Sequence, residues 1–152
     1  MPPRTMGNPM REYIDAGLDA YWSATLTDVT GMSKPPFAPL VRASGITLYL
    51  SGQTYPVIGS ASPLPAAEAS LEEQTRACLE NIDNLVRAGG GTREDIVKVT
   101  IFNTRMDQQD VVNAVYAAFF TTHRPARSHV EVSRLADLDL LIEIEAIAVE
   151  DR

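Results

Sequence analysis

The chain has 152 residues, of which 45% are hydrophobic and 22% charged, and this composition predicts one globular domain with a single core. A formal charge of −7 argues against nucleic acid or an anionic membrane surface as a partner, because both require clustered Lys and Arg side chains. The single cysteine excludes an internal disulfide. No apolar run approaches the roughly 20 residues that cross a bilayer, so we expect a cytoplasmic protein.

The N-terminal segment carries the signals of a helix. Asn8 and Pro9 are residue types favoured at a helix N-cap and first turn, and apolar residues then recur at spacings of three and four. We therefore predict an amphipathic helix over residues 8–23. A stretch rich in turn-forming residues follows, so we assign residues 1–33 to an N-terminal extension and residues 34–152 to the main domain.

The central part of the chain alternates strands and helices. Ser70 and Glu73 have the spacing of a capping box, and an apolar stripe that includes Cys78 follows until three glycines end the helix. We interpret Cys78 as a small core residue. Period-two and period-3.6 patterns predict further elements: strands over 46–51 and 94–104, and a second helix over 107–121.

Two strands are expected after Pro125, and both contain charged residues. Because side chains alternate along a strand, Arg127, His129 and Glu131 share one face of the first. In the second, an apolar stripe occupies the even positions from 138 to 148, so Glu143 and Glu145 lie on the opposite face. Two interpretations remain open: these charges lie on a solvated face or pair across the sheet, or they meet in a binding site.

The order of elements predicts an α+β fold with one mixed β-sheet and two helices packed on one face. Such a sheet leaves its other face bare, so we expect neighbouring subunits to cover it in an oligomer. The two histidines, His123 and His129, have neither cysteine partners nor the spacing of a metal motif. We therefore predict no metal site.

Several blocks of the sequence, in the same order, resemble one known family. The run "PARSHVEVSRL" followed by "IEIEAIAVE" is similar to the signature of the RidA/YjgF/YER057c/UK114 family. The blocks "LYLSGQ", "EEQTRACLENIDNLVRAGGGTREDIVKVTIF" and "VVNAVYAAFF" resemble its other conserved segments. The resemblance covers about residues 36–150, which makes residues 34–152 a RidA-like domain.

The resemblance implies a chorismate-mutase-like fold and a homotrimer with three ligand sites in the clefts between subunits. Family members of the RidA type hydrolyse reactive 2-enamine and 2-imino acids, such as 2-aminoacrylate, to the 2-keto acid and ammonia. They use no cofactor of their own. The expected partner is therefore a small carboxylate-bearing metabolite.

The family's functional residues can be transferred to matching positions. Arg127 matches the arginine that holds the substrate carboxylate, a role suited to its planar, permanently charged guanidinium. Glu143 matches the acidic residue that positions the attacking water or moves a proton. Ser51 and Gly52 match a loop at the ligand, and Asn113 matches a polar residue that lines the site.

Two positions depart from the family pattern. Phe37 stands where deaminating members often have a tyrosine, which keeps the ring and loses the hydroxyl. His129 stands where Cys or Thr is common, as a second ligand contact, a general acid or base, or a residue of the pocket rim. We also expect the helix of the extension to pack on the trimer and narrow the cleft.

Three functions are compatible with these residues. The leading hypothesis is hydrolytic deamination of a 2-imino acid. The second is a specialised catabolic deaminase for an aminomuconate-like acid, which His129 and the extension would suit. The third is a non-enzymatic, trimeric metabolite-binding or regulatory protein, because a fold does not fix a function. The ribonuclease label used in the family fits poorly with an acidic chain.

Overall fold

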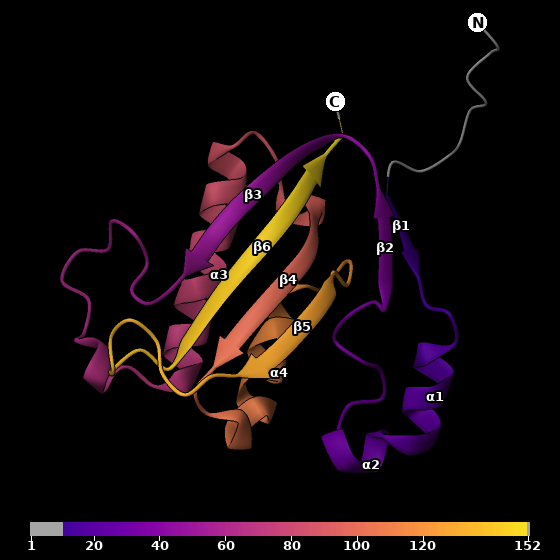
Figure 1. The fold of residues 1–152 in the computed structure, drawn as a ribbon, viewed down its shortest axis with the longest axis horizontal. Helices are drawn as coiled ribbons and strands as arrows, with labels where there is room; N and C mark the ends of the chain where they lie inside the picture. The colour runs from indigo at the N-terminus through magenta and orange to yellow at the C-terminus, as the bar shows by residue number, and fades with distance from the viewer. Residues whose placement is uncertain (1–10, 152) are drawn as a thin grey trace, which may run out of the picture.

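A computed structural model describes residues 11–151, and the main body of the protein is a sheet with helices packed against it (Figure 1). The strands are β1 (Arg11–Ile14), β2 (Leu40–Ala43), β3 (Ile46–Gln53), β4 (Ile96–Asn103), β5 (Ala126–Glu131) and β6 (Ile142–Glu150). The helices are α1 (Leu18–Thr25), α2 (Thr27–Thr30), α3 (Leu71–Ala88) and α4 (Gln109–Phe119), with 3₁₀ turns at Ala66–Glu68, Arg93–Asp95 and Met106–Gln108. Within the described residues, none of these helices is both long and apolar enough to cross a membrane.

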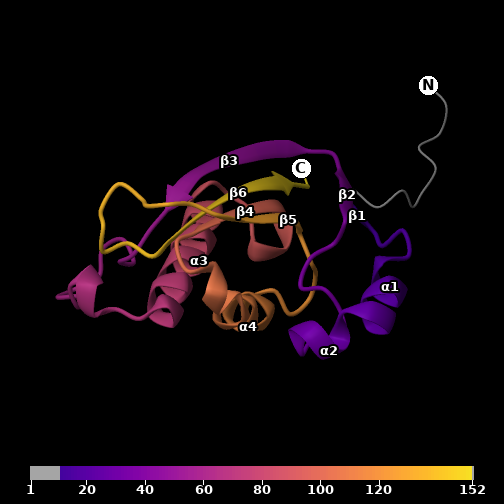
Figure 2. The ribbon, with the colours of Figure 1, turned by 60° about the horizontal axis from the view of Figure 1, so that its bottom comes forward.

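The main sheet has the strand order β3-β6-β4-β5. Strand β6 runs antiparallel to β3 and to β4, whereas β5 runs parallel to β4. Figure 2 shows α3 and α4 on the same side of the sheet, with none of the described helices on the other side. The predicted α+β architecture, one mixed sheet with two helices packed on one face, is therefore confirmed.

The core lies between this sheet and its two helices. Ten of the side chains that fill it are at most 2% exposed: Cys78, Leu79, Ile82, Val86, Val99, Ile101, Val112, Ile142, Ile144 and Ala146. Burial of each large aliphatic side chain contributes roughly 1.5–3 kcal/mol to the free energy of unfolding. The core therefore fixes which faces of β4 and β6 point toward the helices.

Helix α3 begins at the predicted capping box. The Glu73 N–H donates to the Ser70 hydroxyl over 3.2 Å, and the Ser70 N–H donates to the Glu73 carboxylate over 2.7 Å. On its inner face Cys78 is fully buried. Burial, assisted by the negative charge of Glu143, raises the pKa of the Cys78 thiol to about 12. The interpretation of Cys78 as a small core residue is confirmed, and its thiol stays protonated near neutral pH.

The predicted helix over residues 8–23 is wrong for residues 11–17 and correct from Leu18 onward. Asn8 and Pro9 lie outside the described residues, and 11–14 form strand β1, which pairs antiparallel with β2 in a separate ribbon. Helix α1 starts only at Leu18, because Ala16 and Gly17 both have positive φ angles and interrupt any helix before it.

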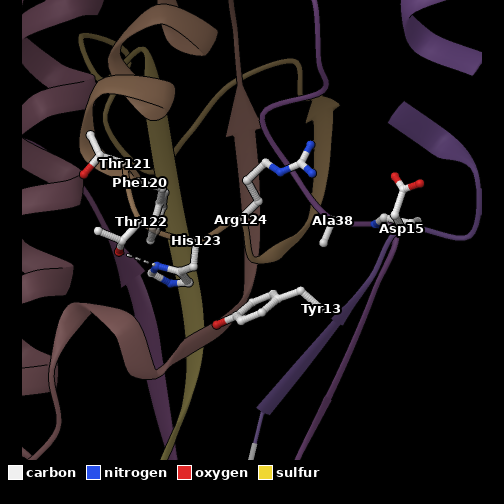
Figure 3. Close-up of a pocket in the computed structure, with 9 residues that line it drawn as sticks. Tyr13, Asp15, Ala38, Phe120, Thr121, Thr122, His123 and Arg124 are labelled. Carbon is white, nitrogen blue, oxygen red and sulfur yellow. Dashed lines mark hydrogen bonds between the residues drawn. The ribbon is translucent and has the colours of Figure 1, made fainter. Parts of the chain in front are cut away.

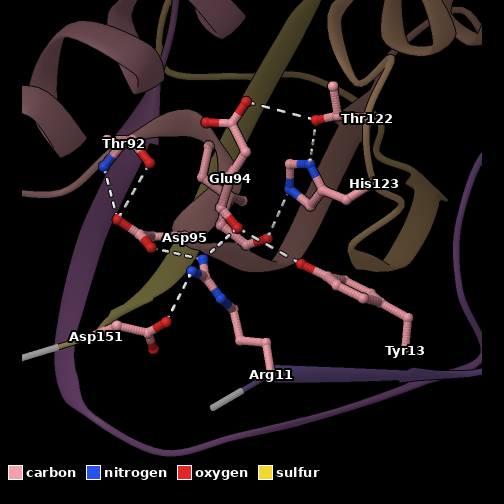
Figure 4. Close-up of polar contacts among 9 residues, drawn as sticks. Arg11, Tyr13, Thr92, Glu94, Asp95, Thr122, His123 and Asp151 are labelled. Carbon is pink, nitrogen blue, oxygen red and sulfur yellow. Dashed lines mark hydrogen bonds and ion pairs between the residues drawn. The ribbon is translucent and has the colours of Figure 1, made fainter. Parts of the chain in front are cut away.

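Arg11 attaches this ribbon to the main body. Its guanidinium pairs with Asp95 at 2.5 Å and with Asp151 at 3.3 Å, and it also donates to the Glu94 carbonyl (Figure 4). Tyr13 reaches the same carbonyl from the next inward position of the strand. The helical spacing of apolar residues in this segment thus arises by chance, since pairing with a distant strand decides its structure.

The final strand is shorter than expected. The predicted apolar stripe starts at residue 138, but β6 begins at Ile142, and Leu138 is 74% exposed. Asp137 forms a turn here, because its side chain accepts from the Asp139 N–H over 2.9 Å and its carbonyl from the Leu140 N–H. The fully buried amide of Gln74 then fixes this turn to α3, donating to the Asp139 carbonyl over 3.1 Å.

The segment before β2 lies along the outer edge of β5. The Ala38 N–H donates to the Pro125 carbonyl over 3.1 Å, and Ala38 forms a parallel bridge with Ala126. Figures 1 and 2 both place the N-terminal segment, with α1 and α2, beyond this edge. As a result, residues of the extension come close to the side chains of β5.

Candidate active site

Arg127 lies on β5 and points toward helix α4. Its Nη1 donates to Asn113 Oδ1 over 2.8 Å, and its guanidinium carbon lies 5.1 Å from the ring centre of Phe37 and 4.8 Å from that of Tyr116. Within residues 11–151 no carboxylate forms an ion pair with Arg127. Burial lowers the pKa of Arg127, yet a guanidinium stays charged near neutral pH. The side chain is thus a held, half-buried cation with no anionic partner in the described chain.

His129 lies two residues further along the same face. Asn103 Oδ1 accepts from the Arg105 N–H over 2.8 Å, so its amide nitrogen faces His129 Nε2 at 3.1 Å and donates to it. The neutral imidazole therefore carries its proton on Nδ1. Burial, and secondarily the charge of Arg127, lowers the pKa of His129 to about 4. At neutral pH the ring is uncharged, and its Nδ1–H can donate a hydrogen bond.

These side chains line one pocket of about 730 Å³. Four predicted site residues meet there: Phe37, Asn113, Arg127 and His129. The other lining residues come from the extension and from the start of α4: Trp22, Val29, Thr30, Gly31, Asp107, Gln109 and Asp110. A volume between about 300 and 1,000 Å³ is typical of small-molecule sites.

The remaining predicted residues, Ser51, Gly52 and Glu143, form a second group elsewhere. The Glu143 carboxylate packs directly over Gly52: a Cβ atom at position 52 would lie 1.9 Å from Glu143 Oε1. Ser51 precedes Gly52 on β3 and is exposed. Any larger residue at position 52 would therefore force the Glu143 side chain to move.

The two groups are separated by the sheet itself. Arg127 pairs in register with the fully buried Val99, so its side chain leaves on the helix side. Glu143 alternates with the buried Ile142 and Ile144 and pairs with Phe102, so its side chain leaves on the open side. In addition, β5 and β3 are opposite edges of the sheet, about 14 Å apart at three spacings of roughly 4.8 Å.

Three residues at the site were not predicted from the sequence. Tyr116 belongs to the apolar face of α4, but its ring also supports the Arg127 guanidinium. Asn103 is fully buried within a strand, which is an unusual place for an amide and was the one available signal. Trp22 lines the pocket, although the sequence predicted only that the extension narrows a cleft.

A second pocket of about 370 Å³ lies between the ribbon and the segment that leads into β5 (Figure 3). Tyr13, His123 and Arg124 line it. Arg124 is already neutralised by two contacts with Asp19, at 2.9 and 3.0 Å, and donates to the Pro35 carbonyl. This pocket marks where the extension docks and has no cation available for an anionic ligand.

No group of three or more His, Cys, Asp or Glu side chains within residues 11–151 is arranged to hold a metal ion. The charged and polar groups that line the pocket include the Arg127 guanidinium, the Asn113 amide, the neutral His129 imidazole and the carboxylates of Asp107 and Asp110.

Comparison with known proteins identifies related sequences. The model of the Endoribonuclease L-PSP family matches residues 32–150. The 2-iminobutanoate/2-iminopropanoate deaminase of Escherichia coli K12 is 45% identical over 108 residues, which cover 69% of this chain and 80% of that protein.

Solved structures show the same fold. The crystal structure of E. coli TdcF with bound serine is similar with a TM-score of 0.61 and 39% identity, over 69% of this chain and 81% of that one. YyfB of Yersinia pestis, a Rid protein of unknown function, is similar with a TM-score of 0.70 and 27% identity, over 93% and 99%. The chain therefore belongs to the RidA/YjgF/YER057c/UK114 (Rid) family.

Proposed function

We propose that this protein is a hydrolytic deaminase that converts reactive 2-enamine and 2-imino acids to 2-keto acids and ammonia. The observation that carries the proposal is the Arg127 guanidinium, which is held in a pocket by Asn113 and lacks an anionic partner within residues 11–151. A carboxylate is the planar anion that this fork matches. The name of the 45% identical E. coli relative, a 2-iminobutanoate/2-iminopropanoate deaminase, supports the same reaction class.

The reaction requires that the substrate is bound, that a water molecule attacks it, and that protons move from this water to the leaving nitrogen. Arg127 donates two parallel hydrogen bonds to the substrate carboxylate and so holds C2 of the imine at a fixed place beside it. The oxygen of water adds to C2, the C–N bond breaks, and nitrogen leaves as ammonia once protons have moved onto it from the water. The neutral His129 donates from Nδ1 to the ligand and adds no charge next to Arg127.

We further propose that the working protein is a trimer in which Glu143 of the partner subunit meets Arg127. One chain cannot bring the two together, because they leave the sheet on opposite faces. Large apolar side chains are exposed on the open face of the sheet: Tyr49 is 80% exposed and Val130 is 43% exposed. Such exposed apolar surface is typical of a face that another subunit covers in an oligomer. In that arrangement Glu143 positions the water or moves its protons, with Ser51 and Gly52 beside it.

Ammonia or keto-acid release from 2-iminopropionate, formed in place by an amino acid oxidase, tests the proposal. The wild-type protein should accelerate release above spontaneous hydrolysis, and Arg127→Ala should abolish the acceleration. Arg42→Ala is the matched control, because Arg42 is exposed on β2 and outside the pocket. If Arg127→Ala still accelerates release, the assignment of Arg127 to the site is wrong. If the wild-type protein accelerates the hydrolysis of no imine, the proposed deaminase activity is wrong.

A further inference from the structure

The pocket around Arg127 is walled on one side by the N-terminal extension. Trp22 of α1 and Val29 of α2 face Arg127 and His129 across it. With a volume of about 730 Å³ in the described chain, the pocket has room for a ligand larger than a three-carbon imino acid. A larger ligand side chain would meet the apolar surface of the extension.

Specific contacts hold this wall in place. Arg124, at the start of β5, pairs with Asp19 of α1 through both of its terminal nitrogens, at 2.9 and 3.0 Å. Its hydrogen bonds lower the pKa of Asp19, so the carboxylate stays charged. The Trp22 Nε1–H donates to the Met32 carbonyl over 3.0 Å, which fixes the indole.

The indole also contacts the residue that covers Arg127. Trp22 and Phe37 pack edge to face with ring centres 5.9 Å apart, and Phe37 in turn lies over the guanidinium. A continuous aromatic surface therefore starts at the carboxylate site and extends along the extension.

The charges at the other side of the pocket restrict the ligand further. Asp107 and Asp110, at the start of α4, are exposed and line it. Their carboxylates repel a second negative charge on the ligand, whereas an uncharged side chain bears no such cost. The pocket thus disfavours dicarboxylates, including an aminomuconate-like acid.

We propose that the extension, through Trp22, selects monocarboxylate 2-imino acids with a bulky apolar or aromatic side chain. The proposal rests on the deaminase function above and deepens it by naming the substrate class. Trp22 and Val29 contact the side chain of the ligand, while Arg127 holds its carboxylate.

Turnover of two imines tests the selection. Wild type should have a higher kcat/KM for the imine of phenylalanine than for 2-iminopropionate. Trp22→Ala should lower the first value about tenfold more than it lowers the second. Tyr21→Ala is the matched control, because this neighbouring ring is 60% exposed and lines no part of the pocket. Val29→Ser should also lower kcat/KM for the imine of phenylalanine. Because Val29 is 78% exposed, this substitution should leave the fold intact.

A binding measurement separates this inference from the deaminase proposal. Trp22 is the only tryptophan of the chain, so its fluorescence reports directly on the pocket. Phenyllactate, an unreactive aromatic carboxylate, should change that fluorescence saturably and far more strongly than lactate, and Arg127→Ala should abolish the response.

The possible outcomes differ clearly. Fluorescence binding without turnover of any imine would overturn the deaminase and keep the ligand class. Turnover with equal preference for both imines, unchanged in Trp22→Ala and with no fluorescence response, would overturn the selection by Trp22 and keep the deaminase.

Discussion

Arg127 and Glu143 leave the same sheet on opposite faces, Arg127 toward α4 and Glu143 toward the open side. The family resemblance predicts both as site residues, yet the described chain does not bring them together. In a cyclic trimer each interface joins two different surfaces of neighbouring subunits, so an arginine and a glutamate from different chains can meet. This arrangement has a direct genetic test.

Mixed trimers of two inactive variants should regain activity. We expect Arg127→Ala and Glu143→Gln each to be inactive alone, and mixed trimers of the two to show about a third of wild-type activity, because each mixed trimer has one interface out of three that retains both residues. The measurement is imine deamination by protein purified through tags on both variants. An inactive mixture, with mixed trimers confirmed by mass, would assign both residues to sites within one chain.

Gly52→Ala should act through Glu143. The new Cβ would lie 1.9 Å from Oε1 and 2.9 Å from Cγ of Glu143, so the carboxylate must move. We expect a loss of roughly 1–3 kcal/mol in the free energy of unfolding, typical of overpacking, and at least a tenfold loss of activity.

A double-mutant cycle checks that cause. In a Glu143→Ala background the obstructing side chain is gone, so the same Gly52→Ala change should cost less than about 0.5 kcal/mol in urea unfolding. An equal cost in both backgrounds would mean that the glycine is needed for the backbone of β3 and not for Glu143.

The elements that the sequence predicted well are those decided by local patterns. The capping box at Ser70 and the stripe behind it depend on residues at most four apart, and the alternation that puts Arg127 and His129 on one face depends on strand geometry alone.

The elements that it missed depend on distant partners. Strand β1 exists because it pairs with β2, about 30 residues further on, and the pocket wall at Trp22 depends on the Asp19–Arg124 pair, which spans 105 positions. Neither partner is visible in the local sequence. The sequence could therefore predict that the extension lies near the cleft, but not which of its residues line the pocket.

His129 should make stability fall in mild acid. Its pKa is about 4 in the folded chain against 6.5 for a free imidazole, so between these values the unfolded chain binds more protons. Its contribution is therefore complete above about pH 6.5 and is lost as the pH falls toward 4. Urea unfolding near pH 7.5 and near pH 5 measures this loss, which should shrink in His129→Gln.

His123 provides the internal comparison for that experiment. Burial lowers its pKa too, and it remains in both proteins, so the difference between wild type and His129→Gln isolates His129. The variant keeps a polar group that Asn103 can meet. The same pH dependence in both proteins would show that the His129 ring is solvated in the folded state.

Tyr116→Phe should stabilise the protein. The Tyr116 hydroxyl is buried and has no hydrogen-bond partner within residues 11–151, while its ring packs on Phe120 and supports Arg127. Removing an unsatisfied buried hydroxyl while keeping the ring relieves a desolvation cost, so we expect a gain of about 1 kcal/mol in urea unfolding.

Tyr55→Phe is the control with the opposite sign. The Tyr55 hydroxyl donates to the Leu64 carbonyl over 2.8 Å, so its removal should cost roughly 0.5–1.5 kcal/mol. If Tyr116→Phe destabilised the protein as much as Tyr55→Phe does, the Tyr116 hydroxyl would have a partner in the assembled protein. The Tyr116 ring lies beneath the Arg127 guanidinium, so such a partner would lie next to the carboxylate site. A hydrogen bond from that partner to Tyr116 would then help to hold Arg127 in position.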